Sequence, residues 1–322
     1  MNAFPRKYLI LFALLVVVLM TSLLAALLGY GKLKIATHER QKKVEKHKVA
    51  VLVAVDPIAY LVERVGGERT TVATLTPQGK DPESFAPTPK QLADVAASRV
   101  FFRVGLPIEE RFAQNVSSIA PDVETVDLRV GLATLPNPHL HADEEENLHD
   151  EHYEHMEDSL DPHVWTSPAN VRVMIVKIAE TLVAIDPKGA ESYRLNALEF
   201  DKELAALQEE VSRRLAPYKG RAFVVFHPAY GYFAREFGLT QLAVESEGKA
   251  PRPRQLEELV ERIREDSVQK LIVQPEFNRS SALVVADAVG ATLVEHSPLI
   301  KDYFEEIRSL TDDVVGAFAS QE

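Results

Sequence analysis

The sequence predicts an α/β protein with two lobes, each built on a mainly parallel sheet flanked by helices. Apolar strand-like runs alternate with short helical runs between residues 48 and 128, and the alternation returns between 221 and 319. Between these two halves, residues 169–215 show helical periodicity alone. An uncharged run near the start of the chain predicts a separate transmembrane anchor or signal segment.

The first half begins with HKVAVLVAV, an apolar run rich in valine that suits a buried parallel strand. Further strands are expected at 70–75, 99–105 and 123–128, and helices at 57–65, 90–97 and 109–116. The two glycines at 66–67 predict the end of the preceding helix rather than a nucleotide-binding loop.

The middle and second half follow in the same manner. Two amphipathic helices are expected at 169–185 and at 188 to about 215, where Pro217 ends the pattern. Strands are expected at 221–226, 239–244, 269–274 and 291–296, and helices at 230–237, 254–266, 281–289 and 303–319. The predicted division is 1–47 as signal anchor and tether, 48–167 as the N-terminal lobe, 168–186 as an interdomain helix and 187–322 as the C-terminal lobe.

Composition excludes several classes of function. The net charge of −12 argues against nucleic acid as a partner, and the absence of cysteine excludes disulfides, thiolate metal sites, thiol catalysis and a lipid-modified cysteine. Residues 8–30 form an uncharged run of 23 residues preceded by Arg6 and Lys7, long enough to span a bilayer. We expect this run to anchor the chain on the outer face of the cytoplasmic membrane; the alternative is a cleaved signal peptide that leaves a periplasmic or secreted protein.

Four side chains that can bind a metal follow predicted strands or lie in turns that contain proline. They are Glu83 in Asp-Pro-Glu, His163 in Asp-Pro-His, His227 in Phe-His-Pro and His296 in His-Ser-Pro. Proline restricts the backbone, and a metal site requires ligands that are held rigidly. Two or three imidazoles with one carboxylate suit Zn²⁺, Mn²⁺ or Fe²⁺. Each residue also has an ordinary structural interpretation, as a surface histidine or as a carboxylate that binds backbone amides.

A second group of histidines lies in residues 137–160, interleaved with acids. Ten acids and no lysine or arginine occur between Asp143 and Asp161, so the segment cannot fold around a core and is predicted to be a loop. Its histidines favour auxiliary metal capture over simple solvation: His139, His141, His149, His152 and His155.

Catalytic motifs are missing from the sequence. Glu151 falls between His149 and His152 without the His-Glu-x-x-His spacing, and no Gly-x-Ser-x-Gly or phosphate-binding glycine loop occurs. We therefore assign no catalytic residue and expect that the protein is not an enzyme.

Three stretches together resemble a known family. AVDPIAYLVERVGGERTTVATLTPQGKDPESFAPTPKQL, LDPHVWTSPANVRVMIVKIAETLVAIDP and VVFHPAYGYFAREFGL are similar to segments of the bacterial solute-binding proteins of zinc and manganese ABC importers (family 9). The acidic histidine loop is like that of the zinc-specific members. The resemblance covers roughly residues 48–316 and implies two lobes joined by a long helix, with the metal held between them.

The resemblance also implies a ligand set, from which this sequence departs twice. His163 and His227 match the second and third ligands of the family, whereas Glu83 stands where the first is usually histidine. Ser297, beside His296, stands where the last is usually aspartate, so either His296 or water would complete the site. A carboxylate at the first position favours harder ions such as Mn²⁺, while the histidine loop favours zinc.

We therefore predict a monomeric extracytoplasmic receptor that captures Zn²⁺ between its lobes and delivers it to an ABC transporter permease. The same role for Mn²⁺ or Fe²⁺ is the first alternative. A metal-dependent surface adhesin or sensor is another, and a zinc hydrolase with Glu83 as its base is a third.

Overall fold

The computed structural model describes residues 48–86, 88, 91, 97–110, 112, 120–137, 160–245, 253–265, 268–277 and 279–318. The predicted anchor at 8–30 and the histidines at 139–155 lie outside these residues, as do most of the expected helices at 90–97 and 109–116. No helix within the described ranges combines the length and the apolar character needed to cross a membrane.

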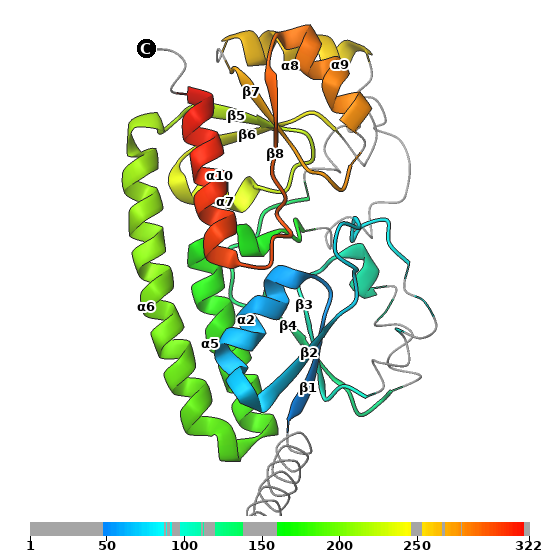
Figure 1. The fold of residues 1–322 in the computed structure, drawn as a ribbon, viewed down its shortest axis with the longest axis vertical. Helices are drawn as coiled ribbons and strands as arrows, with labels where there is room; N and C mark the ends of the chain where they lie inside the picture. The colour runs from blue at the N-terminus through cyan, green and yellow to red at the C-terminus, as the bar shows by residue number, and fades with distance from the viewer. Residues whose placement is uncertain are drawn as a thin grey trace, which may run out of the picture. The chain divides into compact units, whose positions relative to one another are not determined.

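The N-terminal lobe is built on a four-stranded parallel sheet in the order β2-β1-β3-β4 (Figure 1). Its strands are β1 (Val49–Val53), β2 (Thr70–Thr74), β3 (Val100–Arg103) and β4 (Glu124–Asp127), and helix α2 (Asp56–Gly66) connects the first two. The apolar runs form central strands because both faces of β1 and β3 are covered, and Val53, Phe101 and Phe102 are fully buried.

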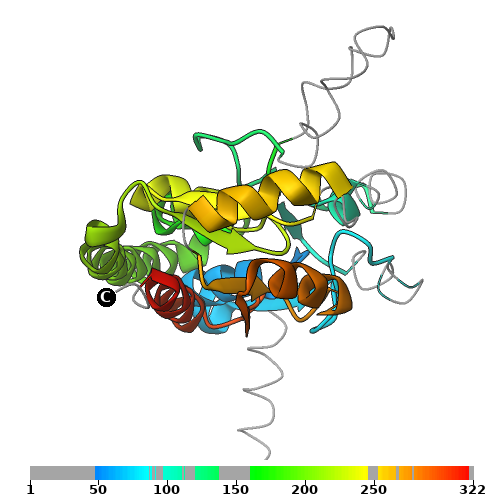
Figure 2. The same ribbon diagram turned by 90° about the horizontal axis from the view of Figure 1, so that it is seen from above.

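The C-terminal lobe repeats this topology with the strand order β6-β5-β7-β8, again all parallel. Its strands are β5 (Ala222–Val225), β6 (Thr240–Ala243), β7 (Lys270–Val273) and β8 (Thr292–Glu295). Its helices are α7 (Gly231–Phe237), α8 (Pro253–Glu265), α9 (Arg279–Val289) and α10 (Tyr303–Phe318). Helices α8 and α9 lie side by side (Figure 2). The predicted fold class is confirmed.

Two long helices, α5 (Pro168–Ile185) and α6 (Ala190–Leu215), pack against each other along one side of both lobes (Figures 1 and 2). Ser167 begins α5, where its hydroxyl accepts a hydrogen bond from the Asn170 amide. Helix α6 contacts α2 of the N-terminal lobe and both α7 and α10 of the C-terminal lobe. Helix α5 falls within the interdomain helix predicted at 168–186, and α6 also contacts elements of both lobes.

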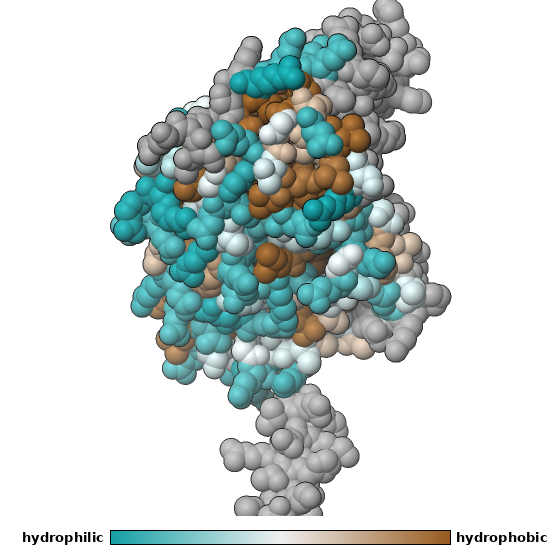
Figure 3. Space-filling view, turned by 45° about the horizontal axis from the view of Figure 1, so that its top comes forward, coloured by the Kyte–Doolittle hydropathy of each residue, from teal (hydrophilic) through white to brown (hydrophobic). Residues whose placement is uncertain are grey.

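Most of the visible surface is hydrophilic, and apolar side chains gather mainly on the C-terminal lobe in the view of Figure 3. Leu283 and Val284 of α9 in that lobe are 44% and 63% exposed. One core cluster runs through both lobes and includes Trp165, Phe200 and Phe223, and a second, smaller cluster lies within the C-terminal lobe.

In both sheets the order in which successive strands are added reverses between the two central strands, β1/β3 and β5/β7. In open α/β sheets, ligands bind beyond the carboxyl ends of the strands at such a point. His227 follows β5 and the turn at 274–277 follows β7, so the C-terminal lobe presents both segments at its switch point.

Candidate metal centre

Three of the four predicted ligands meet in the structure. Glu83, His163 and His227 each offer a ligand atom, and these atoms all lie within 4.8 Å of one another. The Nε2 atoms of His163 and His227 are 3.3 Å apart, and Nε2 of His227 is 3.7 Å from Oε1 of Glu83. Both histidines are buried. The three come from separate segments of the chain, so the cluster depends on the fold of both lobes.

Glu83 is held by the turn that follows β2. Both carboxylate oxygens of Asp81 accept backbone hydrogen bonds, from the amide of Glu83 at 2.9 Å and from that of Ser84 at 3.2 Å. The Phe85 amide donates to the Asp81 carbonyl oxygen. Asp81 therefore acts as a turn-forming residue, and Pro82 adds its fixed φ to the same turn.

His163 is oriented by the acid two residues before it. Oδ1 of Asp161 accepts a hydrogen bond from the backbone amide of His163 at 2.9 Å and lies 2.8 Å from its Nδ1. Asp161 is itself 1% exposed, and the Tyr232 hydroxyl donates to its carbonyl oxygen. This pairing fixes the ring and directs Nε2 into the cluster.

His227 is held on three sides by residues of the C-terminal lobe. Its Nδ1 lies 2.5 Å from Oε1 of Glu245, a buried acid that follows β6. The Gln274 side chain accepts from the backbone amide of His227 and donates to its carbonyl oxygen. The Phe277 ring stacks on the imidazole with a centroid distance of 4.5 Å.

The hydrogen bonds at the two Nδ1 atoms leave both imidazoles able to bind a cation through Nε2. A neutral histidine that donates its Nδ1 proton to a carboxylate leaves the lone pair on Nε2 free to bind a metal. Both Nε2 atoms face the same point, where their lone pairs repel unless a cation or a proton lies between them. Burial by itself lowers the pKa of His163, but the hydrogen bond and charge of Asp161, with the charge of Glu83, raise it overall. Protons therefore compete with a metal for this ring.

His296 is placed differently from the other three. It follows β8 as expected, but its Nε2 is 3.5 Å from Oε1 of Glu306 and its Nδ1 is 3.4 Å from Oδ2 of Asp313, both on α10. Burial lowers its pKa, yet these two acids outweigh burial and raise the pKa to about 9. A protonated imidazole offers no lone pair to a metal. Among the described residues, the structure does not bring His296 into the group formed by the other three.

Sequence reasoning missed the residues that hold His227. Glu245, Gln274 and Phe277 belong to no motif, and only their positions after strands β6 and β7 connect them to the site. Acids and amides at the carboxyl ends of strands were a usable signal, since those ends converge at the switch point.

Comparison with known proteins identifies the family of the chain. The model of the family described as zinc-uptake complex component A, periplasmic (ZnuA), matches residues 51–317. The chain belongs to this family. A crystal structure of ZnuA superposes with a TM-score of 0.75 at 26% identity, covering 84% of this chain and 99% of the other.

The names of two curated relatives indicate that they bind different metals. The high-affinity zinc uptake system protein ZnuA of Paracoccus denitrificans is 38% identical over 141 residues, which are 43% of each chain. The manganese-binding lipoprotein MntA of Halalkalibacterium halodurans is 28% identical over 243 residues, 72% of this chain and 73% of the relative. Family members therefore include both zinc and manganese binders.

Proposed function

We propose that this protein is the extracytoplasmic solute-binding component of an ABC metal importer, and that it captures Zn²⁺ with Glu83, His163 and His227. The observation that carries the proposal is the meeting of two Nε2 atoms and a carboxylate within 4.8 Å, with both Nδ1 atoms paired to carboxylates. A surface histidine needs no such support, whereas a metal ligand does.

The family of the chain, rather than the ligand types, favours a transported cation over a catalytic one. Zn²⁺ accepts nitrogen and carboxylate ligands in the tetrahedral arrangement that such a cluster can provide. The clustered side chains lie between the two lobes, and the sequence carries none of the catalytic motifs that would shape a substrate site. The bound metal would be the cargo, which the protein delivers to a membrane permease.

Manganese is the second candidate cargo. Glu83 supplies a hard oxygen ligand, which suits Mn²⁺ better than a third imidazole would. The manganese-binding name of the Halalkalibacterium relative favours the same possibility. The histidine loop at 139–155 favours zinc, and we give it greater weight because it adds five imidazoles with few other uses.

The remaining proposals concern location and assembly. We infer that residues 8–30 hold the protein at the outer face of the cytoplasmic membrane, and that it acts there as a monomer. The histidine loop would gather metal near the receptor before transfer to the cluster between the lobes.

The direct test is a zinc titration in competition with a chromophoric chelator. We expect His227→Ala to weaken binding at the cluster by more than about 100-fold, beyond the usual cost of losing an outer-shell partner. His296→Gln is the matched control, because it removes one buried imidazole that lies outside the cluster, and it should leave the affinity within about threefold of the wild type. Equal loss of zinc in both variants, or in neither, would contradict the ligand assignment.

A further inference from the structure

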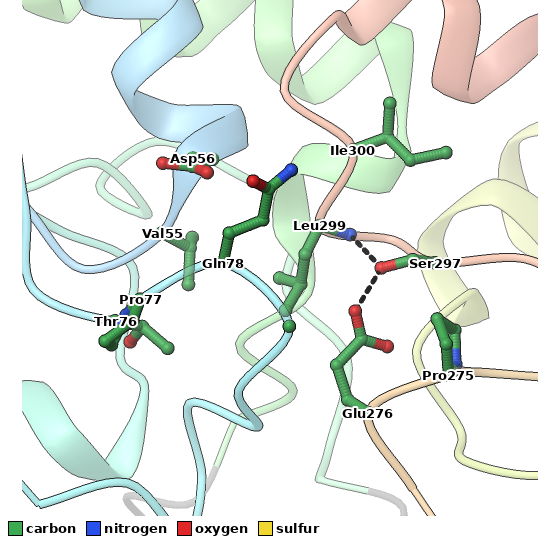
Figure 4. A pocket seen from close by; sticks show the side chains of 11 residues that line it. Val55, Asp56, Thr76, Pro77, Gln78, Pro275, Glu276, Ser297, Leu299 and Ile300 are labelled. Carbon is green, nitrogen blue, oxygen red and sulfur yellow. Dashed lines mark hydrogen bonds between the residues drawn. The ribbon is translucent and has the colours of Figure 1, made fainter.

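A pocket of about 230 Å³ opens between the two lobes and is lined by both of them (Figure 4). The N-terminal lobe contributes Asp56, Thr76 and Gln78, and the C-terminal lobe contributes Glu276 and Ser297. Among the residues that the structure describes, its lining contains two acids and no lysine, arginine or histidine. The charge of this pocket therefore favours a cation.

The carboxylate of Glu276, one of the two acids in this pocket, is held in place by a hydrogen bond. Its Oε1 accepts a hydrogen bond from the Ser297 hydroxyl at 2.6 Å, and that hydroxyl in turn accepts from the Leu299 amide (Figure 4). Its Oε2 is buried and has no hydrogen-bond partner among the described residues. The Thr76 hydroxyl, in a residue that is 4% exposed, is likewise buried, and no residue in the described ranges hydrogen-bonds to it. A buried carboxylate oxygen without a donor is costly unless a ligand satisfies it.

Glu276 also belongs to the turn that holds His227. Two residues before it, Gln274 makes two hydrogen bonds to the backbone of His227, and the next residue, Phe277, stacks on the His227 ring. On the opposite side of the pocket, Gln78 and Gly79 lie in the segment that leads to Glu83. The pocket is therefore bordered by the two segments that carry a histidine and the carboxylate of the metal centre.

We propose that Glu276 supplies a fourth protein ligand to the divalent cation bound by Glu83, His163 and His227. Its Oε2 would bind the cation while Oε1 keeps the hydrogen bond from Ser297. Three protein ligands leave one position of a tetrahedral zinc shell to be filled. Because the two imidazoles are neutral, a second carboxylate would bring the total charge of the ligands to −2 and balance the divalent ion. This inference rests on the proposed function and adds to it a residue that the sequence motifs do not indicate.

Binding by Glu276 requires a local movement. Glu276 lies outside the group whose ligand atoms are within 4.8 Å of one another. It occupies a turn between β7 and α9 rather than a helix or strand, so its side chain can shift toward the cation while the backbone of the turn stays in place.

The test compares the wild type with four full-length variants by zinc competition titration and by the visible spectrum of bound Co²⁺. The variants are Glu276→Gln, Glu295→Gln, His227→Ala and Glu276→Gln combined with Ser297→Asp. Glu276→Gln keeps the size of the side chain and an acceptor for Ser297, but removes the negative oxygen. We expect it to weaken zinc binding by about 10- to 100-fold and to change the Co²⁺ bands, because one ligand of the metal is altered. Glu295→Gln is the control, since it removes one acid from an exposed position in the same lobe.

A rescue variant makes the test specific for a carboxylate at this place. Because the Ser297 hydroxyl is 2.6 Å from Glu276, aspartate at position 297 brings a carboxylate into the same space. We expect Glu276→Gln combined with Ser297→Asp to recover most of the lost affinity.

The outcomes separate this inference from the proposed function. If the wild type binds zinc, His227→Ala abolishes binding at the cluster and Glu276→Gln changes neither affinity nor spectrum, then Glu276 is not a ligand and the receptor function stands. If His227→Ala has no effect either, the metal centre itself is misassigned. Weakened binding in Glu276→Gln with an unchanged Co²⁺ spectrum would also overturn the proposal, because it would indicate only an effect of charge.

Discussion

Each imidazole of the metal centre is paired through Nδ1 with a different carboxylate, His163 with Asp161 and His227 with Glu245. The pairing selects the tautomer that exposes Nε2 and makes the ring a stronger ligand. Asp161 lies within the same Asp-Pro-His turn as its histidine, whereas Glu245 comes from a different strand. The two supports therefore arise from local and tertiary structure, respectively.

Replacement of Glu245 tests this support. Glu245→Gln keeps an acceptor near Nδ1 of His227 but removes the charge, so we expect zinc affinity to fall by about 10- to 100-fold. Glu295→Gln, at an exposed acid, should not change the affinity. The measurement is the competition titration used for the ligand variants. An unchanged affinity in Glu245→Gln would mean that the fold positions His227 without help from this carboxylate.

His296 contributes to stability in a way that depends on pH. Glu306, Asp313, Ser309 and Tyr230 surround its ring. The pKa of His296 in the folded protein is about 9, above its ordinary value near 6.5. Its stabilising effect is therefore fully present below pH 6.5 and is lost as the pH rises through 9.

Urea unfolding of the metal-free protein at pH 6 and at pH 9.5 measures this effect. The shift in pKa corresponds to a free-energy difference on the order of 3 kcal/mol between these conditions. We expect the wild type to lose stability over this range and His296→Gln to lose much less. A parallel loss in both proteins would show that His296 is not the group responsible.

At the scale of elements, the sequence was informative because strands and helices have different apolar periods. Runs such as VAVLV and AFVV identify buried strands, and the spacing of Leu256, Leu259 and Ile263 identifies a helix. All eight strands of the described residues fall within the predicted ranges. The bridging role of α6 was not predicted, because contacts between a helix and two distant lobes leave no periodic signal in the helix itself.

The candidate site was predictable only in part, for a related reason. The sequence singled out Glu83, His163 and His227, which lie together in the structure, because each lies in a turn with proline at the end of a strand or beside one. The same pattern also selected His296, whose side chain instead turns toward α10 because Glu306 and Asp313 attract it. The placement of Glu245 beside His227 and of Glu276 in the pocket between the lobes left no signal in the sequence, because both depend on segments that meet only in the folded chain.

At the scale of the whole molecule, the fold brings together candidate ligands that lie far apart in the sequence. Glu83 comes from the N-terminal lobe, His163 from the segment before α5, and His227 from the switch point of the C-terminal sheet. The lobes are also connected directly, since the Trp165 ring donates to the carbonyl oxygen of Pro298 and Tyr232 donates to that of Asp161. The receptor function that we propose therefore depends on both lobes at once.

The most direct test of this account is a crystal structure of the zinc-loaded protein with anomalous scattering recorded at the zinc absorption edge. We expect one strong anomalous peak bonded to Nε2 of His163, Nε2 of His227 and a carboxylate oxygen of Glu83, at zinc–ligand distances of about 2.0–2.2 Å. A zinc-loaded crystal in which these three side chains carry no anomalous peak, or in which the peak lies on His296, would contradict the assignment of these three residues as the metal ligands.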